Sequence, residues 1–137
     1  MESRLNIGII GSRFYRDHRK IKDTIFKLVQ KYGETLTIVS GGCNAGADKF
    51  AKKFALELGC GYREYNPSHT QKNLYSALHE NFYNKKYKPS NYYHRNKLLA
   101  KGVDCIIAFI PENTKANGTK DTIQHAKKFN KKVVIIN

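Results

Sequence analysis

Blocks of apolar residues alternate with blocks of mixed polarity along this chain, and the blocks predict an α/β protein. Five short runs are rich in isoleucine, valine, leucine and tyrosine, and the first of them is apolar almost throughout. Such continuous runs are typical of parallel strands that are covered on both faces. The runs span residues 5–10, 36–39, 62–65, 105–110 and 132–136.

Between the runs, apolar residues recur at the spacing of one helix face. Gly33 and Gly59 follow two of these segments and predict their C-terminal ends. A shorter helix is expected near residues 73–79, inside an irregular basic segment at residues 68–91. The four longer predicted helices cover residues 20–32, 47–58, 92–101 and 120–129.

Strands that alternate with helices over short connections predict one domain, residues 1–137, with a doubly wound parallel α/β sheet and helices on both faces. Right-handed crossovers favour the strand order 3-2-1-4-5. In that order the first and fourth strands are neighbours, and ligands bind outside the strand C-termini at this switch point. Three loops meet there, at residues 11–13, 40–48 and 111–119.

The loop at residues 40–48 enters a helix and carries Gly41 and Gly42. A glycine-rich turn at a helix N-terminus lets backbone N–H groups approach an anion, and the helix dipole favours negative charge there by about 0.3–1 kcal/mol. We therefore expect both glycines to donate their amides to a phosphate. Glycines also permit a tight turn without any ligand, so the meeting of three such loops is the stronger indication.

Polar residues in these loops have ordinary as well as functional interpretations. Arg13 is suited to forking onto a phosphate or stacking on a base. Asp48 either complements the dipole of its helix, orders the glycine turn or bonds a sugar hydroxyl. Thr119 is either an anion ligand or an ordinary N-cap. His69 shows no metal-ligand spacing and is interpreted as a surface residue.

Composition limits the partners of the chain. A formal net charge of +14 over 137 residues attracts polyanions, although a lysine-rich solvated surface gives the same value. No apolar run approaches the roughly 18 residues that span a membrane. Three cysteines at unrelated spacings and a strand close to the N-terminus favour a cytoplasmic protein with reduced thiols, no metal site and no cofactor.

Four motifs in order resemble the SLOG superfamily, which joins DprA-type DNA-processing proteins, the LOG cytokinin-activating enzymes and many small nucleotide-binding domains. The similarity is greatest to the small stand-alone YspA-like branch, frequent in bacteria and phages. It implies a Rossmann-like domain that binds a nucleotide or a derivative, and often a homodimer through the helix at residues 92–101. The motifs are Gly11-Ser12-Arg13, Ser40-Gly41-Gly42 with Gly46-Ala47-Asp48, Arg95-Asn96 and Gly118-Thr119.

The resemblance adds Asp17, Arg95 and Asn96 to the candidate site. The complete set of candidate ligand-binding residues is Gly11, Ser12, Arg13, Asp17, Ser40, Gly41, Gly42, Gly46, Asp48, Arg95, Asn96, Gly118 and Thr119.

One departure from the LOG pattern concerns catalysis. LOG enzymes cleave the bond between base and ribose 5′-monophosphate, but Thr122 stands here where their motif has a glutamate. Asp121 is adjacent, yet one step along a helix turns a side chain by about 100°. Asp48 and Asp121 are therefore the catalytic candidates of an alternative, N-glycosidic hydrolysis, and the main expectation is a module that senses or sequesters a nucleotide-type ligand.

A further alternative is binding of single-stranded nucleic acid, because lysines and tyrosines interleave at residues 72–93 and aromatic side chains stack on unpaired bases. The segment at residues 68–91 is also expected to act as a flap that brings Tyr92, Tyr93 and Tyr83 near a base.

Overall fold

Five parallel strands form one sheet in the order β3-β2-β1-β4-β5, so the predicted doubly wound α/β fold and its strand order are confirmed. The computed structural model describes residues 4–137. The strands are β1 (Leu5–Gly11), β2 (Leu36–Ser40), β3 (Gly61–Glu64), β4 (Cys105–Phe109) and β5 (Lys132–Ile136).

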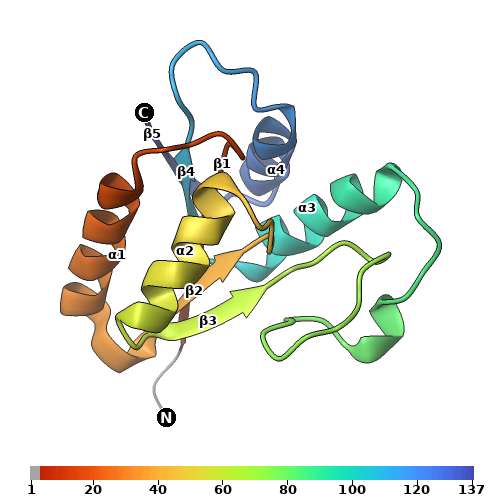
Figure 1. The fold of residues 1–137 in the computed structure, drawn as a ribbon, viewed down its shortest axis with the longest axis horizontal. Helices are drawn as coiled ribbons and strands as arrows, with labels where there is room; N and C mark the ends of the chain where they lie inside the picture. Colours follow the sequence, from red (N-terminus) through yellow and green to blue (C-terminus); the bar gives the residue numbers. More distant parts are fainter. Residues whose placement is uncertain (1–3) are drawn as a thin grey trace.

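Two pairs of helices cover the sheet, one pair on each face (Figure 1). On β1, Ile7 and Ile9 pack toward α1 and α2, whereas Ile10 packs toward α3 and α4. Because successive side chains point to opposite faces, burial on both faces explains why the strand is apolar throughout. The helices are α1 (His18–Tyr32), α2 (Gly46–Glu57), α3 (Ser90–Gly102) and α4 (Asn117–Lys128).

All four long helices begin one to three residues earlier than the apolar spacing indicates. Helix α1 begins at His18 because Asp17 is its N-cap, with Oδ1 accepting a hydrogen bond of 3.2 Å from the amide of Lys20. Helix α4 begins at Asn117, so Gly118 and Thr119 lie inside its first turn instead of before it. Within residues 4–137, no helix combines the length and the apolarity that crossing a membrane requires.

The helix predicted near residues 73–79 is wrong. The amide of Glu64 donates to the carbonyl of Tyr75, and the amide of Ala77 donates to the carbonyl of Glu64, each at 2.9 Å, so this segment pairs briefly with β3. The side chains of Asn73 and Ser76 accept nearby backbone amides at 2.8 and 2.9 Å. Such local bonds compete with helix formation. A short 3-10 turn, η2 (Glu80–Phe82), follows this segment.

The segment at residues 68–91 is closed at its base. The amide of Asn84 donates to the carbonyl of Thr70 at 3.0 Å, and that of Lys85 donates to the carbonyl of Ser68 at 2.9 Å. Tyr83 is buried within it. Figure 1 shows the segment beyond β3 on the side of α3, away from α1 and α2.

Candidate functional site

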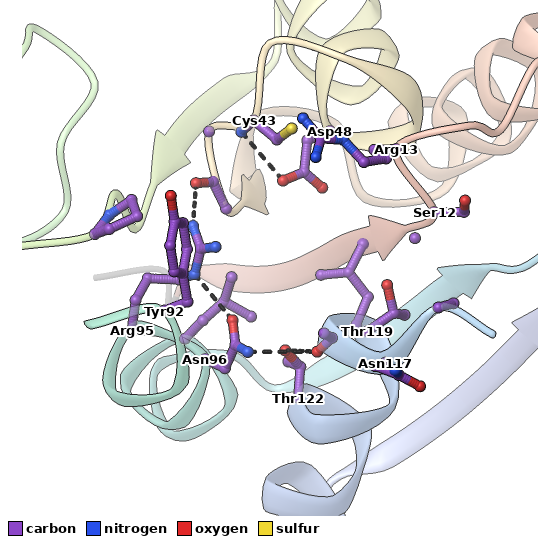
Figure 2. Close-up of a pocket in the computed structure, with 18 of the residues that line it drawn as sticks. Ser12, Arg13, Cys43, Asp48, Tyr92, Arg95, Asn96, Asn117, Thr119 and Thr122 are labelled. Atoms are coloured by element: carbon purple, nitrogen blue, oxygen red, sulfur yellow. Dashed lines mark hydrogen bonds between the residues drawn. The ribbon is translucent and has the colours of Figure 1, made fainter. Parts of the chain in front are cut away.

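A cavity of about 960 Å³ lies at the carboxyl ends of β1, β2 and β4, where the loops after these strands meet α3 and α4 (Figure 2). The loops at residues 40–48 and 111–119 therefore open onto the same cavity. Ten of the thirteen candidate ligand-binding residues line it, and their role in binding stays a prediction. They are Gly11, Ser12, Arg13, Gly41, Gly42, Asp48, Arg95, Asn96, Gly118 and Thr119.

The other three candidates do not line the cavity, but they hold the loops that do. Asp17 caps α1. Ser40 is fully buried, its hydroxyl is 2.6 Å from the hydroxyl of Tyr62, and it accepts the amide of Gly42 at 3.1 Å. Gly46 has a φ of +61° and lies against the backbone of Ser12, where a side chain would overlap it.

Of the two catalytic candidates, Asp48 lines the cavity and Asp121 does not. Oδ2 of Asp121 accepts a hydrogen bond of 3.2 Å from Nδ2 of Asn96 and lies 3.6 Å from Nε2 of His125. Asp121 thus ties α4 to α3. Thr122 lines the cavity instead, and its hydroxyl donates to the carbonyl of Gly118 at 3.2 Å.

The glycine turn after β2 is filled by a carboxylate of the chain itself. Oδ2 of Asp48 accepts the amide of Cys43 at 3.2 Å, and the backbone of Gly41 also favours the ionised form of this side chain. The amide of Gly42 is bonded to Ser40. This corrects the expectation that Gly42 offers a free amide to a phosphate: both glycines line the cavity, but the N–H group of Gly42 already has an acceptor.

A buried polar network supports the turn. Gly42 has a φ of +76°, and a Cβ there would overlap the side chains of Glu64 and Asn66. Glu64 is 1% exposed and receives hydrogen bonds from Asn73 at 3.1 Å and from Lys52 at 3.4 Å. Its burial is not predicted from the sequence, because a glutamate on a strand usually faces solvent. Its one signal is its register opposite Ser40, at the carboxyl end of β3.

Arg95 fastens the turn to α3. Its Nη1 donates to the carbonyl of Gly41 and, at 3.0 Å, to the carbonyl of Tyr65, while Nε donates to Oδ1 of Asn96 at 2.9 Å. The guanidinium also lies over the ring of Tyr92, 5.9 Å from its centre. The side chain that resembles a ligand-facing arginine is therefore already bonded to backbone carbonyls.

The ionisation of Asp48 reflects this environment. Burial is the main cause that raises the pKa of its carboxyl to about 6, and the negative charge of Glu64 acts in the same direction. Arg95 and the two backbone hydrogen bonds lower the pKa, but by less. At pH 7 the carboxyl is mostly ionised and presents a negative charge to the cavity.

The N-terminus of α4 lies at another end of the cavity and, unlike the glycine turn, is not capped by a side chain. Its N-cap, Ala116, provides no side-chain acceptor, and the first amide bonded back to it is that of Lys120 at 3.0 Å. Within residues 4–137, the amides of Asn117, Gly118 and Thr119 therefore have no acceptor. The first turn also lacks an acidic residue. Three amides and the positive end of the helix dipole thus remain available to an anion.

Aromatic side chains form one wall of the cavity. Tyr92 and Tyr93 line it as expected, but Tyr83 does not, because it is buried at 3% exposure. His69 is not a plain surface residue: it lines the cavity, and its ring centre lies 5.2 Å from that of Tyr92 and 4.9 Å from that of Tyr87. Among the described residues, no group of three or more His, Cys, Asp or Glu could hold a metal ion.

Comparison with protein families gives a match over the whole length of this chain. A family model described as DNA recombination-mediator protein A matches residues 1–137. A search of curated proteins gave no match.

Three solved structures have a similar fold. DNA processing protein A from Helicobacter pylori, described for its single-stranded DNA binding mode, is 21% identical with a TM-score of 0.69, over 98% of this chain and 66% of that one. The molybdenum cofactor binding protein from Rippkaea orientalis is 20% identical with a TM-score of 0.69, over 98% and 77%. The molybdenum cofactor carrier protein from Chlamydomonas reinhardtii is 17% identical with a TM-score of 0.66, over 96% and 76%.

These likenesses show the fold, a Rossmann-like domain of the SLOG type. The chain spans just under two thirds of the H. pylori protein.

Proposed function

The chain belongs to the DNA recombination-mediator protein A family, and on this premise we propose that its cavity binds a nucleotide or a nucleotide-derived small molecule, as a sensing or sequestering module. The solved neighbours support binding of a ligand or a nucleic acid by this fold in general. Placement in the YspA-like branch, a homodimer and a cytoplasmic location stay predictions.

The observation that carries the proposal is the uncapped N-terminus of α4. The free amides of Asn117, Gly118 and Thr119 line a cavity that Arg13 and Lys115 also line. Amides at a helix N-terminus bind phosphate by hydrogen bonds, and cations that line the same cavity attract it by charge. A volume of about 960 Å³ is at the upper end of small-molecule sites and leaves room for more than a phosphate.

A pair of variants at Gly118 tests the phosphate end. A Cβ at Gly118 meets no atom within 4 Å, so a small side chain fits there. Gly118→Asp places a negative charge where the phosphate is proposed to bind, and Gly118→Asn has nearly the same size without the charge. We expect Gly118→Asp to weaken binding at least 10-fold and Gly118→Asn to change it less than 3-fold.

The measurement starts with native mass spectrometry of the purified protein, which detects a co-purified nucleotide. Titration calorimetry then uses a panel of nucleoside mono-, di- and triphosphates. The Asp variant should not melt earlier than the Asn variant, because an acidic residue in the first turn stabilises a helix by about 0.3–1 kcal/mol. Absence of binding to the whole panel, or equal affinity of both variants, would overturn the proposal.

Single-stranded nucleic acid is the second candidate. The net charge of +14 and the exposed rings of Phe14, Tyr92 and Tyr93 at the cavity favour it. Binding of a single strand loses affinity with salt, with a slope of about −0.7 per phosphate contacted in a log–log plot. A small ligand held in the cavity keeps most of its affinity in 0.3 M salt, so titrations of an oligothymidylate and of a mononucleotide over a salt series separate the two.

The hydrolase alternative now depends on Asp48, because Asp121 lies outside the cavity. Release of free base from a nucleoside monophosphate, measured by chromatography, would favour it. Its absence with all four common bases would remove it.

A further inference from the structure

Asp48 gives the cavity a second polar end of opposite character. Its Oδ2 is bonded to the amide of Cys43 at 3.2 Å, whereas Oδ1 has no partner within the described part of the chain. Figure 2 shows the carboxylate on the upper wall beside Cys43, with its second oxygen facing the cavity. The side chain therefore presents a fixed hydrogen-bond acceptor to whatever fills the cavity.

This acceptor excludes a phosphate from the glycine turn. Two negative charges in contact repel each other strongly where little water screens them. The amides of Gly42 and Cys43 already have acceptors and therefore do not offset that repulsion. An anion is thus directed to α4, and the region beside Asp48 suits a ligand group that donates hydrogen bonds.

The position of Asp48 within the cavity indicates which donor this is. On one side, the guanidinium of Arg95 bonds Gly41 next to the carboxylate and lies over the ring of Tyr92. On the other side, Thr119 and the amides of α4 line the cavity. Figure 2 shows Asp48 on the upper wall of the cavity, with Tyr92 on one side below it and Thr119 on the other. In a nucleotide, the sugar likewise lies between the base and the phosphate.

We infer that the free carboxylate oxygen of Asp48 accepts hydrogen bonds from the vicinal sugar hydroxyls of the ligand, so that the cavity selects ribonucleotides over 2′-deoxyribonucleotides. This inference rests on the proposed function, because it needs the phosphate at α4. A buried acceptor that is built for a hydroxyl discriminates strongly against an analogue that lacks it, since the acceptor is then left unpaired.

The variant Asp48→Asn separates this role from ordering of the turn. An asparagine oxygen still accepts the amide of Cys43, but an NH₂ group, which is a donor, then stands where the free oxygen stood. Asp104→Asn is the matched control. Asp104 also orders a loop, through a bond of 2.8 Å from the amide of Asn6 to its Oδ2, and it lies outside the cavity.

The experiment is calorimetry at pH 7.5 with matched pairs of probes: the four ribonucleoside 5′-monophosphates with their 2′-deoxy counterparts, and ribose 5-phosphate with 2-deoxyribose 5-phosphate. We expect the original protein and Asp104→Asn to prefer the ribo member at least 10-fold for the pairs that bind. Asp48→Asn should reduce this preference below 3-fold.

Equal affinities within each pair, or a preference that persists in Asp48→Asn, would overturn the inference while leaving phosphate binding intact. If no probe binds, and the Gly118 variants behave like the original protein, the proposed function fails and the inference fails with it.

Discussion

Arg95 and Gly41 lie 54 residues apart in the sequence and are joined by a hydrogen bond from the guanidinium to the carbonyl oxygen. On the N–H side of the same turn, Asp48 accepts the backbone bonds. A cation and an anion from two different helices thus hold opposite sides of one glycine turn. The shape of this wall of the cavity therefore depends on both side chains before any ligand arrives.

Arg95→Lys should destabilise the fold although it keeps the charge. A single ammonium group does not reproduce the bonds that Nη1 and Nε make to Gly41, Tyr65 and Asn96. We expect a loss of about 1–3 kcal/mol in the free energy of unfolding, measured by urea denaturation. Lys97→Ala, at an exposed position of the same helix, is the control and should cost less than about 0.5 kcal/mol. Equal stability of both variants would show that the hydrogen bonds of Arg95 contribute nothing to the free energy of unfolding.

The pKa of Asp48 predicts a pH dependence of stability. Because the folded pKa is about 6, above the ordinary 3.8, the unfolded chain ionises first as the pH rises. The contribution of this group is fully present below pH 4 and is lost as the pH rises through about 6. The loss amounts to at most about 3 kcal/mol at pH 7, since one pKa unit corresponds to about 1.4 kcal/mol.

Asp48→Asn removes this titration. We expect the variant to match the original protein near pH 4 and to exceed it by about 1–3 kcal/mol at pH 7, in urea denaturation followed across this range. A variant that is less stable than the original at pH 7 would contradict the raised pKa.

Gly42→Ala and Gly59→Ala compare the same backbone conformation in two surroundings. Their φ angles are +76° and +75°, but a Cβ at Gly59 meets no atom within 4 Å, whereas one at Gly42 overlaps Glu64 and Asn66. Gly59→Ala should cost about 1–2 kcal/mol for the left-handed conformation alone. Gly42→Ala should cost at least about 2 kcal/mol more in the same denaturation assay, and similar losses would mean that the network under the turn yields easily.

Removing the hydroxyl groups of two buried tyrosines should change the melting temperature in opposite directions. The hydroxyl of Tyr83 is buried without a hydrogen-bond partner among the described residues, whereas that of Tyr62 bonds Ser40 at 2.6 Å and Glu64 at 3.5 Å. Removing an unsatisfied buried polar group is favourable and removing a partner is not. In thermal melts we expect Tyr83→Phe to raise the melting temperature and Tyr62→Phe to lower it.

The sheet followed from the sequence because its causes are local or general: apolar runs, helix spacing and right-handed crossovers. The helix near residues 73–79 did not form because Asn73 and Ser76 bond to nearby backbone, which a hydrophobic pattern does not record. The bond between Asp48 and the glycine turn depends on where the side chain of Asp48 points, which a sequence pattern does not record either. His69 was missed for a related reason, since only the folded segment brings it beside Tyr92.

The hydrogen bonds that link Ser68 with Lys85 and Thr70 with Asn84 close the base of the segment at residues 68–91, and the backbones of Tyr75 and Ala77 join its inner part to β3 at Glu64. The exposed tip at residues 79–81 lies between these contacts and does not line the cavity. Insertions or exchanges at this tip therefore leave the register of β3 and the lining of the cavity untouched, whereas a deletion that reaches Tyr75 breaks the bonds to Glu64.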